Sequence, residues 1–125
     1  MCLELQSFTT DKTHNDPLVQ RAQMWLQDHL TEQVRMTDLA QLLAISERTL
    51  IRRFRKVLEQ APLTYLQNLR ISTARVLLES GDLSIEKIIH YVGYSDIRTF
   101  YRLFRKRVGF TPGAYRARFQ SLTRT

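Results

Sequence analysis

One segment of this chain occurs twice, and this repeat constrains the fold more than any other feature of the sequence. Residues 48–65, RTLIRRFRKVLEQAPLTY, and residues 98–115, RTFYRLFRKRVGFTPGAY, lie 50 positions apart and are identical at eight of 18 positions. Unrelated segments would share about one. A unit used twice implies one physical task performed twice. The identical pairs are Arg48/Arg98, Thr49/Thr99, Arg52/Arg102, Phe54/Phe104, Arg55/Arg105, Lys56/Lys106, Pro62/Pro112 and Tyr65/Tyr115.

Positive charge is concentrated in the repeated segment. The 125 residues carry a net charge of +7, which favours a polyanionic partner. Ten of the 19 Lys and Arg residues fall within 48–56 and 98–107, whereas seven of the 12 acids precede residue 48. No apolar run is long enough to span a membrane. The single cysteine, Cys2, and a start without the pattern of a secretory signal lead us to expect a cytoplasmic protein.

Helical periodicity predicts an all-α fold of about seven helices, with two helix-turn-helix subdomains joined by a long connecting helix. We expect helices at about 17–31, 36–44, 47–58, 62–80, 85–92, 97–108 and from 112 onward. The expected division is a flexible tail or linker end at 1–15, a first subdomain at 16–61, the connecting helix at 62–80, a second subdomain at 81–120 and a tail at 121–125. The connecting helix would be roughly 25–30 Å long.

Residues that are typical of helix ends support these predicted helix limits. Ser46, Ser84 and Asp96 are typical N-cap residues, and Gly81 and Gly109 are typical of helix ends. The residues just before the two basic helices repeat at a spacing of 49 positions instead of 50, so the second copy contains one additional residue. Because insertions usually occur in turns, this residue indicates where the turn lies.

Each basic helix has an apolar face and a cationic face. The expected inner faces are Leu50, Phe54, Val57 and Leu58 in the first copy, and Phe100, Leu103, Phe104 and Val108 in the second. The expected outer faces are Arg48, Ile51, Arg52 and Arg55, and Arg98, Tyr101, Arg102 and Arg105. Since a shorter helix and a turn precede each copy, both have the geometry of recognition helices that enter the DNA major groove.

The predicted contacts divide by position along these helices. Arginine can pair bidentately with guanine and isoleucine can meet a thymine methyl group, whereas later basic residues more often bind phosphate. The base-contact candidates are Arg48, Ile51, Arg52, Arg98, Tyr101 and Arg102. The candidates for base or phosphate are Ser46, Thr49, Ser95 and Thr99. The phosphate candidates are Arg55, Lys56, Arg105, Lys106 and Arg107. We expect one molecule to read two successive major grooves.

The alternatives are a basic helical module that binds RNA, acidic proteins or a membrane surface without base specificity. A basic helix face is usually just solvated, but two copies in register favour a shared function. No catalytic residue, metal site or cofactor is expected, because His14, His29 and His90 are scattered and neither a carboxylate pair nor a phosphate-binding glycine loop is present.

The second half of the chain resembles the DNA-binding domain of AraC/XylS-type bacterial transcription regulators. The resemblance rests on SIEKI at 84–88, VGYSD at 92–96, Phe100, RLFRK at 102–106, GFTP at 109–112 and Tyr115-Arg116, and extends over 18–119. It implies sequence-specific promoter binding at the bacterial nucleoid by an activator or repressor. It also implies a separate sensor domain that this chain lacks, RNA polymerase as a further partner, and a domain that is monomeric by itself. Residues 22–30 are similar to members with an amidase-like sensor.

Four residues depart from the family pattern. Arg35 stands where a capping Ser or Thr is common, and Ala44 and Glu59 stand where the family often has glycine. Ile89 replaces a small residue in the second motif. We therefore expect the first motif to be the looser one.

Overall fold

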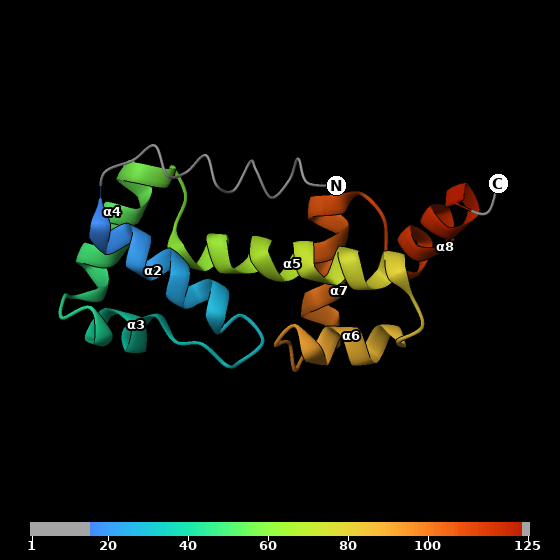
Figure 1. The fold of residues 1–125 in the computed structure, drawn as a ribbon, viewed down its shortest axis with the longest axis horizontal. Helices are drawn as coiled ribbons and strands as arrows, with labels where there is room; N and C mark the ends of the chain where they lie inside the picture. Colours follow the sequence, from blue (N-terminus) through green and yellow to red (C-terminus); the bar gives the residue numbers. More distant parts are fainter. Residues whose placement is uncertain (1–15, 124–125) are drawn as a thin grey trace. The chain divides into compact units, whose positions relative to one another are not determined.

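The computed structural model describes residues 16–123, with side chains up to residue 120, and this part of the chain is entirely α-helical between its loops (Figure 1). The helices are α2 (Pro17–Asp28), α3 (Met36–Leu42), α4 (Glu47–Leu58), α5 (Pro62–Ser80), α6 (Ile85–Tyr91), α7 (Ile97–Val108) and α8 (Pro112–Thr123). The predicted all-α fold is confirmed. Helix α8 continues to Thr123, past the predicted start of the C-terminal tail, and the tail predicted at 1–15 lies outside the described residues.

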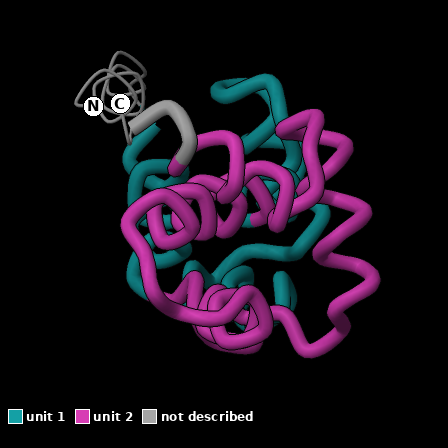
Figure 2. Tube along the Cα trace, turned by 90° about the vertical axis from the view of Figure 1, so that its right-hand side faces the viewer, with its two compact units in different colours: residues 1–28, 34–66 teal, residues 29–33, 67–125 magenta. Residues whose placement is uncertain are grey.

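The chain forms two compact units, coloured teal and magenta in Figure 2. Unit 1 comprises residues 1–28 and 34–66, and unit 2 comprises residues 29–33 and 67–125. The boundary falls inside α5. Residues 62–80, which we expected to connect two subdomains, therefore contribute to both units, and the loop residues 29–33 belong with the second.

Each unit has its own apolar core built from three helices. In unit 1 the first turns of α5 add Tyr65 and Leu66 to this core. The buried apolar residues at repeat-equivalent positions of the three helices are Val19, Ala22, Leu26, Leu39, Ala40, Leu50 and Phe54 in unit 1, and Ile71, Ala74, Leu78, Ile88, Ile89, Phe100 and Phe104 in unit 2; Leu69 of α5 is buried as well. Trp25 of α2 lies at the edge of the first core and is half-buried.

These two cores match position by position, so the repeat is longer than the sequence indicates. Buried residues of α2 and α5 lie 52 positions apart, those of α3 and α6 lie 49 apart, and those of α4 and α7 lie 50 apart. The duplicated unit is therefore a set of three helices. Its first helix is hidden in the sequence because only Ala22/Ala74 and Leu26/Leu78 are identical within it.

A tyrosine that follows each recognition helix also packs in the same way in the two units. The rings of Phe54 and Tyr65 meet edge to face at 5.4 Å, and those of Phe104 and Tyr115 do so at 5.8 Å. Such pairs add to the stabilisation from burial. The repeated aromatic residues therefore have a structural role in both units.

The hydroxyl groups of the two tyrosines bond to α2 and α5 at equivalent positions. Gln23 Nε2 and Gln27 Nε2 lie 3.4 and 2.9 Å from Tyr65 Oη. In unit 2, 52 positions later, Arg75 Nε lies 3.3 Å from Tyr115 Oη, and the Tyr115 hydroxyl donates to Glu79. Two neutral amides are thus replaced by two charged groups.

Candidate nucleic-acid interface

The recognition helices α4 and α7 each begin at a residue that caps them through its side chain. Ser46 Oγ accepts from the Thr49 N–H at 3.0 Å, and Asp96 Oδ1 accepts from the Arg98 N–H at 3.1 Å. Both predicted caps are confirmed. The Thr99 hydroxyl donates to Asp96 Oδ2 at 2.7 Å, and this bond lowers the pKa of the exposed Asp96 carboxyl below its ordinary value.

Both recognition helices end after 12 residues at a residue in the left-handed conformation. These residues are Glu59, with φ of 60°, and Gly109, with φ of 92°, and they occupy equivalent positions in the repeat. The turns before the helices also match, because Ala44 and Gly93 have φ of 59° and 93°. The backbone therefore repeats even where Ala44 and Glu59 replace glycine, at a cost of about 1–2 kcal/mol for each such residue.

The cationic faces point to solvent in both units. Arg48, Arg52, Arg55 and Lys56 are exposed in α4, and Arg98, Arg102, Arg105 and Lys106 are exposed in α7. Ile51 and Tyr101, the repeat-equivalent residues between the arginines, are half-buried. The inner faces are as expected, with Leu50, Phe54, Phe100 and Phe104 buried and the flanking aliphatic residues half-buried.

A shallow depression lies on each cationic face. The depression of unit 1 is lined by Glu47, Arg48, Ile51 and Arg52, and that of unit 2 by Tyr101, Arg102, Arg105, Lys106 and Thr111. The first contains a carboxylate, whereas all three ionic residues lining the second are cationic. The second depression therefore presents the stronger positive field to an anionic ligand.

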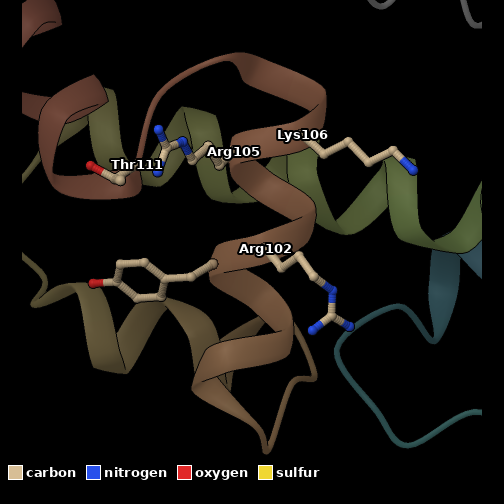
Figure 3. Close-up of a pocket in the computed structure, with 5 residues that line it drawn as sticks. Arg102, Arg105, Lys106 and Thr111 are labelled. Carbon is tan, nitrogen blue, oxygen red and sulfur yellow. The ribbon is translucent and has the colours of Figure 1, made fainter.

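Figure 3 shows the directions in which the cationic side chains of unit 2 extend from α7. In this view Arg105 extends to the left, toward Thr111, and Arg102 and Lys106 extend to the right. The Thr111 hydroxyl oxygen accepts from the Ala114 N–H at 3.1 Å, so Thr111 caps α8 as its position before Pro112 predicts. The depression thus combines three cations with the start of a helix, where unpaired N–H groups favour anions.

Several predicted contact residues already have partners within the protein. Arg107 donates to Asn68 Oδ1 and, at 3.0 Å, to Gln67 Oε1, which ties α7 to α5. The hydroxyl groups of Ser46 and Thr49 bond to each other at 2.9 Å. Ser95 is exposed in the turn. Arg107, Thr49 and Thr99 therefore have structural roles that the sequence did not reveal, whereas the capping role of Ser46 was predicted.

Two further arginines hold the motifs in place, and sequence reasoning missed both. Arg53 of α4 makes a bidentate ion pair with Asp16, at 2.8 and 3.1 Å. Asp16 also caps α2 by accepting from the N–H groups of Leu18 and Val19. Arg70 of α5 is buried and bonds to carbonyl groups of the α2–α3 loop. Arg53 could have been suspected from its place on the flank between the two faces of α4, whereas Arg70 gave no local signal.

Among residues 16–123, no cluster of three or more His, Cys, Asp or Glu side chains is arranged to hold a metal ion. None of the helices described in that range is both long and apolar enough to cross a membrane.

Comparison with known proteins assigns the fold. The helix-turn-helix domain family matches residues 39–118, which is more than half of the chain. The transcriptional activator RhaS of Salmonella paratyphi B is 33% identical over 110 residues, covering 88% of this chain and 40% of RhaS. This chain thus spans less than half the length of that relative.

Solved structures support the same assignment of the fold. The C-terminal domain of AraT, a response regulator from Geobacillus stearothermophilus, has a TM-score of 0.79 and 30% identity, over 82% of this chain and 85% of that one. The DNA-binding domain of the transcriptional factor AdpA, in complex with a target DNA, has a TM-score of 0.79 and 34% identity, over 86% and 96% of the two chains. An AraC-type regulator from Chromobacterium violaceum has 29% identity and a TM-score of 0.75, over 82% and 92%. The chain therefore belongs to the AraC-type helix-turn-helix family, whose members are DNA-binding domains of transcription regulators and not enzymes.

Proposed function

We propose that this domain binds a specific double-stranded DNA sequence for a transcription regulator, with α4 and α7 entering successive major grooves. One observation carries the proposal: a three-helix unit occurs twice, and each copy exposes arginine at the same two positions of its capped third helix. The AdpA domain, of similar fold, has been solved with its target DNA, which supports the same class of ligand here.

The base contacts are assigned to the first two turns of each recognition helix. Arg48 and Arg98 lie in the first turn, and Arg52 and Arg102 lie about one turn later on the same face. A recognition helix reads base edges with its N-terminal part, and a guanidinium group can donate to guanine O6 and N7 together. These four arginines would therefore read guanines.

Between the arginines, Ile51 and Tyr101 would contribute apolar contacts. Both line the depressions on the cationic faces, and an apolar side chain can contact the methyl group of thymine. Because the two residues differ in size and only Tyr101 carries a hydroxyl group, the two helices should prefer different base sequences.

The phosphate contacts are assigned to later positions and to the helix starts. Arg55, Lys56, Arg105 and Lys106 are exposed beyond the base-reading turns, where basic residues generally fix the register on the duplex. Arg107 would reach a phosphate only by releasing its bonds to α5. Ser46, Thr49, Ser95 and Thr99 flank the helix starts, and any of their hydroxyl groups that remains accessible could bind base or phosphate.

A selection from random DNA duplexes tests the proposal, because it needs no assumption about the operator sequence. The selected duplex should bind about 10³-fold more tightly than random duplex at physiological salt. Equal affinity for all duplexes, single strands and RNA would instead favour a basic module without base specificity.

Two variants of α7 separate base contacts from phosphate contacts. Arg102→Ala should remove the preference at one base pair, at a cost of about 1–3 kcal/mol, whereas Lys106→Ala should weaken all sequences alike and reduce the salt dependence by about one unit of slope. Identical behaviour of the two variants across the selected pool would refute the division of roles. Arg48→Ala serves as the equivalent of Arg102→Ala in unit 1.

The wider context is proposed from the relatives. RhaS is a transcriptional activator, so this domain would serve an activator or repressor that acts at the nucleoid in the cytoplasm, with a separate sensor domain and RNA polymerase as further partners. The domain should be monomeric by itself, because each molecule carries both recognition helices. Sedimentation at micromolar concentration checks this, and a dimer would contradict it.

A further inference from the structure

Arg70 is a charged residue in the interior of unit 2. Its side chain is 8% exposed, and burial lowers its pKa, an effect that Tyr94 opposes. A buried guanidinium group is costly unless hydrogen bonds satisfy it. Arg70 Nε donates to Leu30 O at 2.7 Å, Nη2 donates to Glu32 O at 2.5 Å, and the guanidinium carbon lies 5.3 Å from the centre of the Tyr94 ring.

The same guanidinium group packs against the turn that leads into α7. A Cβ atom on Gly93 would lie 2.9 Å from Arg70 Cζ and 2.9 Å from Leu30 O, closer than ordinary contact distances. Gln33 Nε2 donates to Gly93 O at 3.0 Å. Gly93 is therefore held by α5 and by the α2–α3 loop together. We call these five residues, Leu30, Glu32, Gln33, Arg70 and Gly93, the turn latch.

Unit 1 has a different arrangement at its equivalent turn. Leu18 occupies the position 52 residues before Arg70, so an aliphatic side chain stands where unit 2 has the guanidinium. The residue equivalent to Gly93 is Ala44, which is exposed. The comparison explains why this position tolerates a methyl group in the first motif. In the second motif the latch occupies the space that the methyl group would need.

We propose that Arg70 is a positioning residue for base recognition by α7. Gly93 lies three residues before Asp96, the N-cap of α7, so fixing the turn fixes the first turn of the helix that carries Arg98 and Arg102. A bidentate arginine–guanine contact depends on distance and angle. If this turn could shift, α7 would therefore discriminate less strongly between base pairs. The base readout by α4 would not change. This inference rests on the proposed function.

The test is a random-duplex selection with Arg70→Leu, which installs the residue type of the equivalent position, and with Arg70→Lys. Arg48→Ala and Arg102→Ala first identify the base pairs read by α4 and α7. Arg70→Leu should reduce discrimination about tenfold at the α7 base pairs, and leave the α4 base pairs unchanged. Arg70→Lys keeps the charge without the planar fork, and should give a smaller loss at the same base pairs.

Arg75→Lys is the matched control, because Arg75 lies on the same helix and its guanidinium group bonds to Tyr115 on α8 instead of to the turn. It should preserve discrimination at both sets of base pairs. Amide exchange at residues 93–97 provides a second readout, and should accelerate in Arg70→Leu and not in Arg75→Lys.

Each outcome of these experiments either supports or contradicts the positioning role of Arg70. A folded Arg70→Leu protein that loses discrimination equally at both sets of base pairs, or at neither, would overturn the inference. If Arg70→Leu does not fold, then Arg70→Lys decides by the same criterion. Failure of the proposed function would appear separately, as a wild-type domain that selects no consensus sequence.

Discussion

Replacing Glu59 by glycine should stabilise unit 1, because this residue ends α4 in the left-handed conformation. Its φ is 60° and its side chain is exposed, so the substitution removes backbone strain without removing packing. Its repeat equivalent, Gly109, has the same role at the end of α7 with φ of 92°. The two positions form a matched pair in one molecule.

The expected magnitude follows from three contributions. Relief of the left-handed conformation contributes about 1–2 kcal/mol. The greater freedom of glycine in the unfolded chain costs about 0.5–1 kcal/mol. Loss of a carboxylate at the negative end of a helix contributes about 0.3 kcal/mol at an exposed site. The net gain should be about 1 kcal/mol, equivalent to a rise in Tm of roughly 3–6 °C for a domain of this size.

Urea denaturation followed by circular dichroism measures the change in the free energy of unfolding. Glu59→Gln removes the charge and keeps the strain, so it should recover only the helix-end contribution. Gly109→Ala is the reverse experiment. A Cβ atom there would have no neighbour within 4 Å, so it should destabilise by about 1 kcal/mol through the backbone alone. If Glu59→Gly were neutral or destabilising while Gly109→Ala was also neutral, backbone conformation would not govern these helix ends.

Three further changes test other parts of the structure. Arg35→Ser should stabilise α3 by about 1 kcal/mol in thermal unfolding, because Arg35 makes no side-chain cap; an unchanged Tm would contradict this. Tyr115→Phe should destabilise unit 2 by about 1–2 kcal/mol in urea, since Glu79 loses its hydroxyl donor; equal stability would show that solvent replaces that bond. The Thr99 hydroxyl lowers the pKa of Asp96, so the contribution of the carboxylate is present above the unfolded-state pKa of about 3.9 and is lost as the pH falls through the lower folded-state value. Melting curves of wild type and Asp96→Asn should differ above about pH 4 and converge below it; a constant difference would exclude the charge as the cause.

The features that could be predicted from sequence are those set by residues close together in the chain. Apolar residues at helical spacing place the seven helices, and short polar residues and glycine place their ends, as Ser46, Asp96 and Gly109 show. The alignment of the repeat locates both recognition helices and their solvent-facing arginines. Helical periodicity and capping depend on interactions within about four residues, so the local sequence indicates them, although α2 and α3 end a few residues earlier than predicted.

Residues that hold the motifs together could not be predicted, because their partners are distant in sequence. Arg107, a predicted phosphate contact, also bonds to residues of α5 about 40 positions earlier, and the sequence does not reveal these partners. Arg53 bonds to Asp16 across 37 positions. The sequence shows that these arginines are cations, but packing of whole helices decides whether each faces solvent or another element.

The sequence by itself determined that this chain is an all-helical protein with two basic recognition helices and a duplicated core pattern. Only the tertiary structure decided that α2 and α5 are the first helices of the two repeats, and that the equivalent turns are held differently. Leu18 and Arg70 are equivalent only once their helices are packed, and the space beside Gly93 is filled by that guanidinium group together with the carbonyl oxygen of Leu30. A close contact between distant segments depends on how the helices pack, which no short stretch of sequence encodes.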